Sequence, residues 1–409
     1  MEKPPLLKNM RILDFTRVLS GPFATMMLGD LGAEVIKIEP PSGDESRFWP
    51  PVMKNGVSAY FTALNRNKRS LVMNLKEARA REIVLKLAVQ ADVVVENFTP
   101  GVAAKLGIDY DSIKDVNPRI IYCAISGFGQ DGPFRDKKAY DPIIQGMTGL
   151  MSITGEKDGP PVKIGIPVTD MIAASHAVSA ILAAYIHRLE SGQGQYIDIS
   201  LYDGVVSWLT IMAMDYFVTG KAPGRWGMDH IHRVPARAFM AADERWVQVA
   251  ATSDVMYAKF CRLLGLEELI DDPRFATNNG RVKNREAIMP FFEEKMKTRT
   301  SEDWMQLLEE AGIPCGPILD IGEVFAGPHA AARGMRFSMP HPVEGQIPQL
   351  GFPYRYSSAS PSARRRPPLL GEHGEEILKQ ALGLDGETIA DLVAHGVVAG
   401  PPTGGGPGG

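Results

Sequence analysis

The amino-acid sequence predicts an α/β protein built on a parallel sheet. Strand-like segments at 11–15 and 34–39 flank a helix-like segment at 21–31, and together they form a βαβ unit. A second helix-like segment at 76–91 leads into a strand at 92–96, and another strand follows at 119–125. Strands that alternate with helices predict a sheet covered on both faces, with ligands bound at the carboxyl ends of the strands.

The rest of the chain completes this domain and predicts a smaller α+β domain. An apolar helix at 171–189 and a strand at 196–199 are expected in the first domain. Segment 201–224 is expected to be a linker. The small domain at 225–322 is predicted from a hairpin at 236–251 and from amphipathic helices at 255–265, 284–298 and 302–311. After a return linker at 323–329, the chain is expected to rejoin 1–200 through 330–398, with a short helix at 388–395 and then a disordered tail or cloning remnant at 399–409.

The composition is that of an ordinary globular protein, and it excludes several classes. With 44% apolar residues, 22% charged residues and a net charge of -4, the chain has no global attraction for nucleic acid or for an anionic membrane. Its three cysteines have no CxxC spacing, which argues against a disulfide framework and against a zinc site. Because no apolar run approaches the ~18 residues that span a bilayer, we expect a cytoplasmic enzyme or binding protein.

Three weaker patterns have structural interpretations that we favour. Residues 127–132 match GxGxxG, a fingerprint of nicotinamide dehydrogenases, but Pro133 follows where a helix should open, so a structural loop is preferred. His230 and His232 lack a third ligand at a recognisable spacing, and we expect no metal. Cys315 lies in a rigid turn without a nearby histidine in the sequence, and it is expected to be a packed thiol.

Asp170, at the start of the apolar helix, is the most informative residue. A carboxylate there can attack an activated acyl group, and the positive end of the helix favours its ionised form by ~0.3–1 kcal/mol. Aspartate at a helix start is also a common structural cap, which is the alternative. Tyr140 and Asp141 lie upstream, and Tyr140 is expected either to position a substrate or to pack in the core.

Nine segments, taken in order, resemble the class III CoA-transferases, the group that contains formyl-CoA transferase and α-methylacyl-CoA racemase. The resemblance runs from about residue 6 to residue 398, and it is carried by ILDFTRVLSGPFATMMLGDLGAEVIKIE, NRNKRS, VENFTPG, AISGFGQDGP, AYD, PVTD, GQGQYIDISL, GIPCGPI and PLLGEH. It implies a Rossmann-like large domain made by both chain ends, with a smaller domain between them. It also implies an interlocked homodimer in which each ring-like subunit is threaded by the other.

The resemblance further implies a chemistry and a set of site residues. Asp170 would form a mixed anhydride with the acyl group and then a thioester with CoA, so CoA thioesters are the expected substrates and no tightly bound cofactor is expected. The residues that match CoA-contacting positions are Val18, Ser20, Met73, Asn74, Leu75, Lys76, Asn97, Phe98, Thr99, Lys105 and Lys138. A basic cradle for the CoA phosphates is expected from Arg66, Lys68 and Arg69, which would otherwise form a solvated turn.

Differences within the resemblance favour transfer of CoA to a dicarboxylate. The racemases carry a histidine at Tyr140, and the formyl-CoA transferases carry a glutamine at Leu19 and a tetraglycine loop that is missing between Arg233 and Ala251. Segment 221–235 resembles enzymes that move CoA from succinyl-CoA to glutarate, citramalate, malate or an aryl-substituted succinate. The second carboxylate of the acceptor would need a cation, for which the candidates are Arg47, Arg225 and Arg233. The alternatives are a racemase and one subunit of a hetero-oligomeric transferase.

Overall fold

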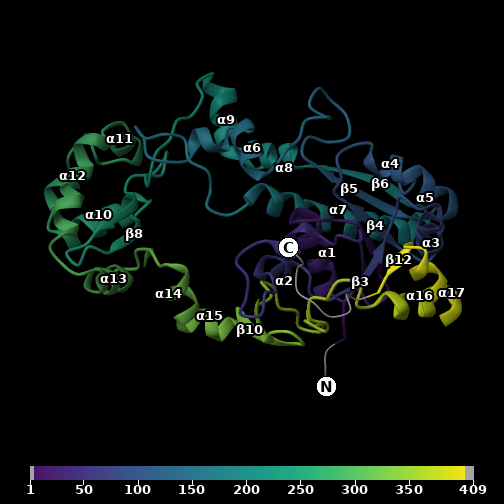
Figure 1. The fold of residues 1–409 in the computed structure, drawn as a ribbon. Coiled ribbons are helices and arrows are strands. Elements are labelled where there is room, and N and C mark those ends of the chain that lie inside the picture. Colours follow the sequence, from purple (N-terminus) through teal and green to yellow (C-terminus); the bar gives the residue numbers. More distant parts are fainter. Residues whose placement is uncertain (1–3, 401–409) are drawn as a thin grey trace. The chain divides into compact units, whose positions relative to one another are not determined.

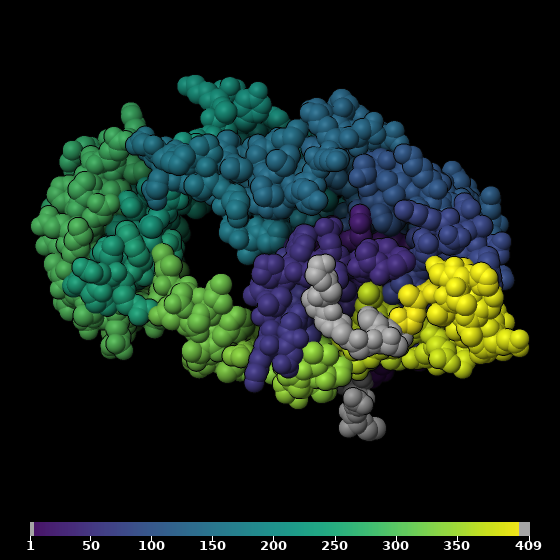
Figure 2. Space-filling view, in the orientation of Figure 1, coloured from purple at the N-terminus to yellow at the C-terminus, as the bar shows by residue number. Residues whose placement is uncertain are grey.

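The computed structural model describes residues 4–400, which form two compact units. Within this range, the first unit contains residues 4–150, 164–214 and 329–400, and the second contains 151–163 and 215–328. Both ends of the described chain therefore belong to one unit. In Figure 2 the C-terminal residues, in yellow, pack against N-terminal residues in blue and purple.

A sheet of seven strands, counted over residues 4–400, forms the centre of the first unit (Figure 1). Its order is β12-β3-β2-β1-β4-β5-β6, and all the pairs that β1 to β6 form with one another are parallel. The C-terminal strand β12 runs antiparallel to β3, with Val398 opposite Met73, so both chain ends contribute to the sheet but in opposite directions. The strands are β1 (Arg11–Asp14), β2 (Glu34–Glu39), β3 (Lys68–Met73), β4 (Val93–Glu96), β5 (Ile121–Ser126), β6 (Gln195–Ser200) and β12 (Val398–Ala399).

Helices cover both faces of this sheet. Successive strand residues point to opposite faces, so Ile12 joins one apolar core and Leu13 joins the other. The core around Leu13 includes residues of α3 (Ala78–Val89), α4 (Val102–Leu106), α5 (Tyr110–Val116), α16 (Gly374–Leu382) and α17 (Gly386–Ala394). The core around Ile12 includes residues of α1 (Ser20–Asp30), α6 (Asp141–Met147), α7 (Val168–Ser191) and α8 (Leu201–Trp208).

The 24-residue helix α7 is long and apolar enough, by length and composition alone, to cross a membrane. Such a helix is weak evidence for a membrane span, because the core helix of a globular protein passes the same test. Here Ile172, Ala177 and Ile181 are buried in the core around Ile12. We therefore interpret α7 as a core helix, as its alanine-rich sequence predicts.

The second unit has its own sheet and core. The expected hairpin is present as β7 (Ala236–Met240) and β8 (Trp246–Ala250), and β9 (Cys315–Pro317) pairs with β8. The helices pack Phe260, Phe292 and Trp304 into one apolar cluster with the hairpin. These helices are α10 (Asp254–Leu264), α11 (Asn278–Lys283), α12 (Arg285–Met296) and α13 (Ser301–Glu310).

The two expected linkers are largely helical, which corrects the interpretation of both segments. Residues 201–224 contain α8 and α9 (Thr210–Thr219), and α8 buries Leu201 and Val205 in the first unit. Residues 323–329 overlap α14 (Ile321–Ala326), which a capping box initiates, and α15 (Pro328–Arg333). The second unit also includes residues 151–163, which no sequence pattern indicated.

Proline and glycine concealed further structure near the C-terminus. β10 (Arg336–His341) and β11 (Gly345–Leu350) form a two-stranded ribbon that accommodates Pro340 and Pro348, because both of its outer edges are unpaired within the described residues. Helix α16 was not expected, whereas α17 lies close to the predicted helix at 388–395. Ala399, assigned to the tail, belongs to β12, and residues 401–409 lie outside the described range.

Candidate active site

A cavity of about 320 Å³ opens in the first unit beside the carboxyl ends of β1, β4 and β5. Its walls come from the segments that follow these strands and from the starts of α1 and α7, as expected for a parallel sheet. The lining residues are Arg17, Val18, Leu19, Ser20, Glu45, Asn97, Phe98, Thr99, Pro100, Ile125, Ser126, Gly127, Arg135, Lys137, Lys138, Ala139, Tyr140, Asp170 and Leu201.

Asp170 is the third residue of α7 and lies partly buried in the cavity wall. Burial and the nearby charge of Asp141 raise the pKa of its carboxyl to about 6. The hydroxyl and the backbone N–H of Ser20 interact with this carboxyl and act to lower its pKa. The net shift is opposite to the one expected from the helix dipole alone, although a carboxyl with a pKa near 6 remains largely ionised at pH 7.

Three helix starts meet at this carboxyl. Ser20 is the first residue of α1, Asp170 belongs to the first turn of α7, and Asp141 is the first residue of α6. Oδ1 of Asp141 accepts 3.0 Å hydrogen bonds from both the backbone N–H and the hydroxyl of Thr169, the neighbour of Asp170. Asp141 thus caps α7 from another helix, and this contact fixes the backbone that carries Asp170.

Tyr140 lines the same cavity as Asp170 and is the N-cap residue of α6. Its side chain is 67% exposed, which excludes the core-packing alternative. The phenol ring is therefore accessible to a molecule bound in the cavity.

The cavity brings together about half of the residues that were expected to contact CoA. Those that line it are Val18, Ser20, Asn97, Phe98, Thr99 and Lys138. Those that lie outside its lining are Met73, Asn74, Leu75, Lys76 and Lys105. Met73 is fully buried in the core around Leu13, and Leu75 packs against that core, so these two side chains serve the fold.

Three further cations that sequence reasoning missed also line the cavity, namely Arg17, Arg135 and Lys137. With Lys138, they outnumber the acidic side chains of the lining, Glu45 and Asp170. Arg17 follows β1, and the other three follow β5, so their position after parallel strands was the available signal. Such an excess of positive charge suits a ligand that carries phosphates or carboxylates.

The prediction of a basic cradle from Arg66, Lys68 and Arg69 is wrong, because all three cations form ion pairs inside the fold. Arg66 pairs with Asp30 at 2.6 Å, and Lys68 pairs with Asp14 at 3.0 Å. Arg69 pairs with Glu34 and with Glu376. These side chains are buried and absent from the cavity lining, so within the described structure they neutralise carboxylates rather than bind phosphate.

The three arginines proposed for a substrate carboxylate lie in different surroundings. Arg47 forms a two-point ion pair with Glu39, donates to the carbonyl of Pro368 and stacks 3.7 Å from the ring centre of Phe61, so it has a structural role. Arg225 donates to the backbone carbonyls of Glu156 and Gly159 within the second unit. Arg233 is exposed in the same unit.

The parallel sheet and the cavity at its edge define an α/β protein in which a partly buried carboxyl and an excess of cations suit an anionic ligand. The sequence profile of CoA-transferase family III matches residues 7–374, and the chain belongs to this family. The protein is therefore a class III CoA-transferase, whose substrates are CoA thioesters.

Characterised relatives and a solved structure agree with this assignment. The chain is 40% identical over 393 residues to the human succinyl-CoA:glutarate CoA-transferase, covering 96% of this chain and 90% of the relative. It is 40% identical over 385 residues to the succinate--glutarate CoA-transferase of Agrobacterium fabrum, covering 92% and 96%. A crystal structure of a CAIB/BAIF family protein from Brucella suis superimposes with a TM-score of 0.82 at 39% identity, covering 93% of this chain and all of that one.

Proposed function

We propose that the protein transfers CoA from succinyl-CoA to a small dicarboxylate, with Asp170 as the covalent carrier. The observation that carries the proposal is the placement of Asp170, a partly buried carboxyl in a cavity whose other walls supply cations and hydrogen-bond donors. Two relatives about 40% identical to this chain are named for exchange between succinate and glutarate, which supports glutarate as the first acceptor to test.

The donor half of the reaction charges the enzyme with CoA. A carboxylate oxygen of Asp170 attacks the thioester carbonyl of succinyl-CoA, the carbon–sulfur bond breaks, and CoA leaves as a thiolate. The thiolate then attacks the Asp170 carbonyl of the mixed anhydride. Succinate leaves as a carboxylate, and Asp170 now carries CoA as a thioester.

The acceptor half repeats these steps in reverse. A carboxylate of the acceptor attacks the Asp170 thioester carbonyl, releases the CoA thiolate and forms a second mixed anhydride. The thiolate attacks the acceptor's acyl carbon, which releases the new CoA thioester and restores the Asp170 carboxylate. Each addition places negative charge on the Asp170 carbonyl oxygen or on the acyl oxygen, and the N–H and hydroxyl of Ser20 are donors in position to stabilise charge at Asp170.

The same proposal includes a homodimer with the interlocked topology implied by the family resemblance. Helix α9 exposes Ile211, Met214, Phe217 and Val218, which recur at a spacing that places them on one side of the helix. A row of exposed apolar residues of this kind supports a protein–protein contact. A second copy of the chain is the proposed occupant.

The test of this function is trapping of the enzyme-bound intermediate. The wild-type protein, mixed with succinyl-CoA, is expected to gain the mass of CoA less one water on Asp170, and to form new CoA esters when glutarate, malate or citramalate is added. Asp170→Ala and Asp170→Asn should give neither result, because the nucleophile is lost. Liquid chromatography with mass spectrometry measures both the adduct and the esters.

Other outcomes would redirect the assignment. An Asp170→Ala protein that still exchanged CoA would contradict the covalent mechanism. Exchange that began only after addition of a related second chain would identify a hetero-oligomeric enzyme. Incorporation of deuterium at Cα of a 2-methylacyl-CoA, without transfer of CoA, would identify a racemase.

A further inference from the structure

The loop between β1 and α1 forms one wall of the cavity, and side chains from other elements hold its backbone in place. Five consecutive polar groups of the backbone, from the N–H of Thr16 to the N–H of Val18, each bond a side chain. Thr16 N–H donates to Asp14 at 2.9 Å, and Thr16 C=O accepts from Lys37 Nζ at 2.7 Å. Arg17 N–H and C=O both bond the Asn97 amide at 2.8 Å. Val18 N–H donates to Asp44 Oδ1 at 3.3 Å.

Val18 has an unfavourable backbone conformation in this loop. Its φ is 67°, in the left-handed region that β-branched residues rarely adopt. A conformation of this kind persists where the surroundings over-determine it, and such residues cluster at functional sites. Two residues later the chain reaches Ser20, which lines the cavity with Asp170 and whose N–H and hydroxyl interact with its carboxyl. The direction of the chain at Val18 therefore sets where these two donors lie.

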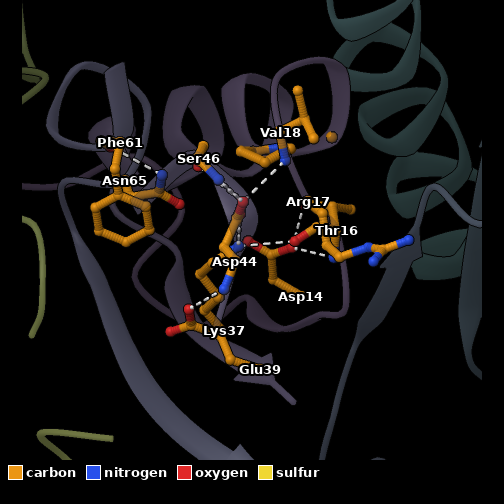
Figure 3. A network of polar contacts seen from close by, with 12 residues as sticks. Asp14, Thr16, Arg17, Val18, Lys37, Glu39, Asp44, Ser46, Phe61 and Asn65 are labelled. Carbon is orange, nitrogen blue, oxygen red and sulfur yellow. Dashed lines mark hydrogen bonds and ion pairs between the residues drawn. The ribbon is translucent and has the colours of Figure 1, made fainter. Parts of the chain in front are cut away.

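Asp44 and Lys37 form the buried ion pair that holds the loop at two points. Figure 3 shows the Asp44 carboxyl beside Val18, Ser46 and Lys37. Its Oδ1 also accepts from the N–H and hydroxyl of Ser46 at 3.0 and 2.7 Å, and its Oδ2 lies 3.0 Å from Lys37 Nζ. Both side chains have no solvent exposure. Although burial opposes ionisation, the opposite charges hold the pKa of Asp44 below and that of Lys37 above the ordinary values.

Stability alone is a weak reason for a buried ion pair, because the cost of removing two charges from water offsets most of their attraction. The pair also holds two backbone groups of the loop in fixed positions. Lys37 binds the carbonyl of Thr16 and Asp44 binds the N–H of Val18, so the two charges fix opposite ends of one three-residue segment. An apolar pair of the same volume would fill the space without holding either backbone group.

We propose that Asp44, paired with Lys37, is a positioning residue that holds Val18 in its left-handed conformation and thereby aims the two Ser20 donors at Asp170. The inference rests on the proposed function, because it assigns Asp44 a role in the reaction of Asp170. If the loop relaxes, the donors withdraw, and the Asp170 carboxyl loses the contacts that favour its ionised form.

The decisive measurement is the pH dependence of kcat/KM for Asp44→Asn. This variant keeps the size of the side chain and one oxygen acceptor but removes the charge that binds Lys37. The acidic limb of the profile is the low-pH range in which kcat/KM rises with pH. We expect its midpoint to move upward by about half a pH unit or more, and kcat to fall about tenfold. The titratable groups that interact with Asp170 are Asp141 of α6 and Tyr60 of α2 (Ala59–Leu64), and both side chains are kept in this variant. Tyr60 also interacts with Asp44, so loss of the Asp44 charge lowers the pKa of Tyr60, which stays neutral at the pH of the acidic limb.

Asp30→Asn is the matched control. Asp30 is also a buried carboxylate, paired with Arg66 at 2.6 Å, but it is the last residue of α1 and touches neither Val18 nor Thr16 in the described contacts. This variant should lose stability while its acidic limb stays in place. An acidic limb that is unchanged in Asp44→Asn, or that moves equally in both variants, would overturn the inference.

A second-site rescue separates positioning from general destabilisation. Glycine adopts a φ of 67° without steric cost, so Val18→Gly in the Asp44→Asn background should return the acidic limb toward its wild-type position, with Val18→Gly alone as the reference. Absence of rescue would count against the inference. If Asp44→Asn does not fold, Ser46→Ala, which removes one donor to Asp44, must shift the limb in the same direction. A wild-type protein without CoA exchange would instead refute the proposed function.

Discussion

At the scale of single residues, the chemistry of Asp170 depends on groups that the sequence places far from it. Its position before an apolar helix was enough to single it out as a candidate nucleophile. The direction of its pKa shift could not be predicted, because it is set by burial, by the charge of Asp141 and by donors from Ser20, which lies 150 positions earlier in the chain. The helix dipole, the one local effect the sequence revealed, is outweighed.

The raised pKa of Asp170 predicts a specific pH profile. The proposed nucleophile must be ionised, so kcat/KM should fall as the pH is lowered through about 6, the pKa of this carboxyl in the free enzyme. Initial rates of CoA exchange between about pH 3.5 and about pH 8 in a constant-ionic-strength buffer would measure it, because this range includes both the ordinary and the shifted pKa. A limb near pH 4 would show that the carboxyl has an ordinary environment in solution.

The same shift predicts that the ionised Asp170 carboxylate reduces the free energy of unfolding. Its folded pKa of about 6 lies above the ordinary value of 3.8, so ionisation costs the folded state free energy as the pH rises from about 4 through about 6. At pH 7.5, Asp170→Asn should therefore unfold with a free energy about 1–2 kcal/mol larger than wild type, after allowance for partial solvent screening. At pH 4 the difference should disappear. Urea unfolding at both pH values tests this, and a less stable variant at pH 7.5 would contradict it.

The basic run at Arg66–Arg69 shows where residue-type reasoning fails. Charge and proximity to a strand suggested a phosphate site, yet Arg66 and Lys68 each face a carboxylate of the same unit. Of the cations that do line the cavity, Arg17 stands alone in the sequence, whereas Arg135, Lys137 and Lys138 form a second short basic run. Their common feature is a place after a parallel strand, which residue type alone does not reveal.

At the scale of elements, the site is built from helix starts rather than from a motif. Strands and helices with a clear apolar period, such as β1, β2 and α7, lie where the sequence predicts them. β11 was missed because Pro348 interrupts its pattern, and α16 was missed because it follows a segment rich in proline and glycine, although α16 itself is amphipathic. Partners far away in the sequence hold the C-terminal region. The Asn67 N–H donates to the carbonyl of Arg365, and the His373 N–H donates to the carbonyl of Ser70.

The junction of α6 and α7 predicts an effect opposite to that of Asp44→Asn. Asp141→Asn keeps an oxygen for the N–H and hydroxyl of Thr169 but removes the charge that raises the pKa of Asp170. The acidic limb of kcat/KM should therefore move downward, by about half a pH unit. Thr169→Val, which removes one hydrogen bond and no charge, is the control and should leave the limb in place. An upward shift in Asp141→Asn would mean that the loss of the cap outweighs the loss of charge.

At the scale of the whole molecule, the exposed side of α9 predicts an assembly. Light scattering should give twice the mass of the chain, because the apolar residues of this helix need a partner surface. Replacing Phe217 and Val218, which are 71% and 79% exposed, by aspartate should lower the yield of dimer. Val255→Asp, at an equally exposed position of α10, should not. A monomeric wild-type protein would refute the proposed dimer.

The division of the chain into units was foreseen in outline and missed in detail. Alternating strands and helices predicted the large sheet, and the family resemblance implied that both chain ends build it. The inclusion of residues 151–163 in the second unit had no signal in composition or period. Which unit a segment belongs to depends on its contacts with residues far away in the sequence, and a single sequence does not show these contacts.

The antiparallel strand β12 has a consequence for biosynthesis. Residues 398 and 399 close the edge of a sheet whose neighbouring strand, β3, emerges more than three hundred residues earlier. During synthesis on a ribosome, the backbone groups at the edge of β3 therefore stay unpaired while the second unit is translated and folds. Chaperone binding during synthesis should concentrate on nascent chains of this intermediate length, and release of the finished polypeptide should end it.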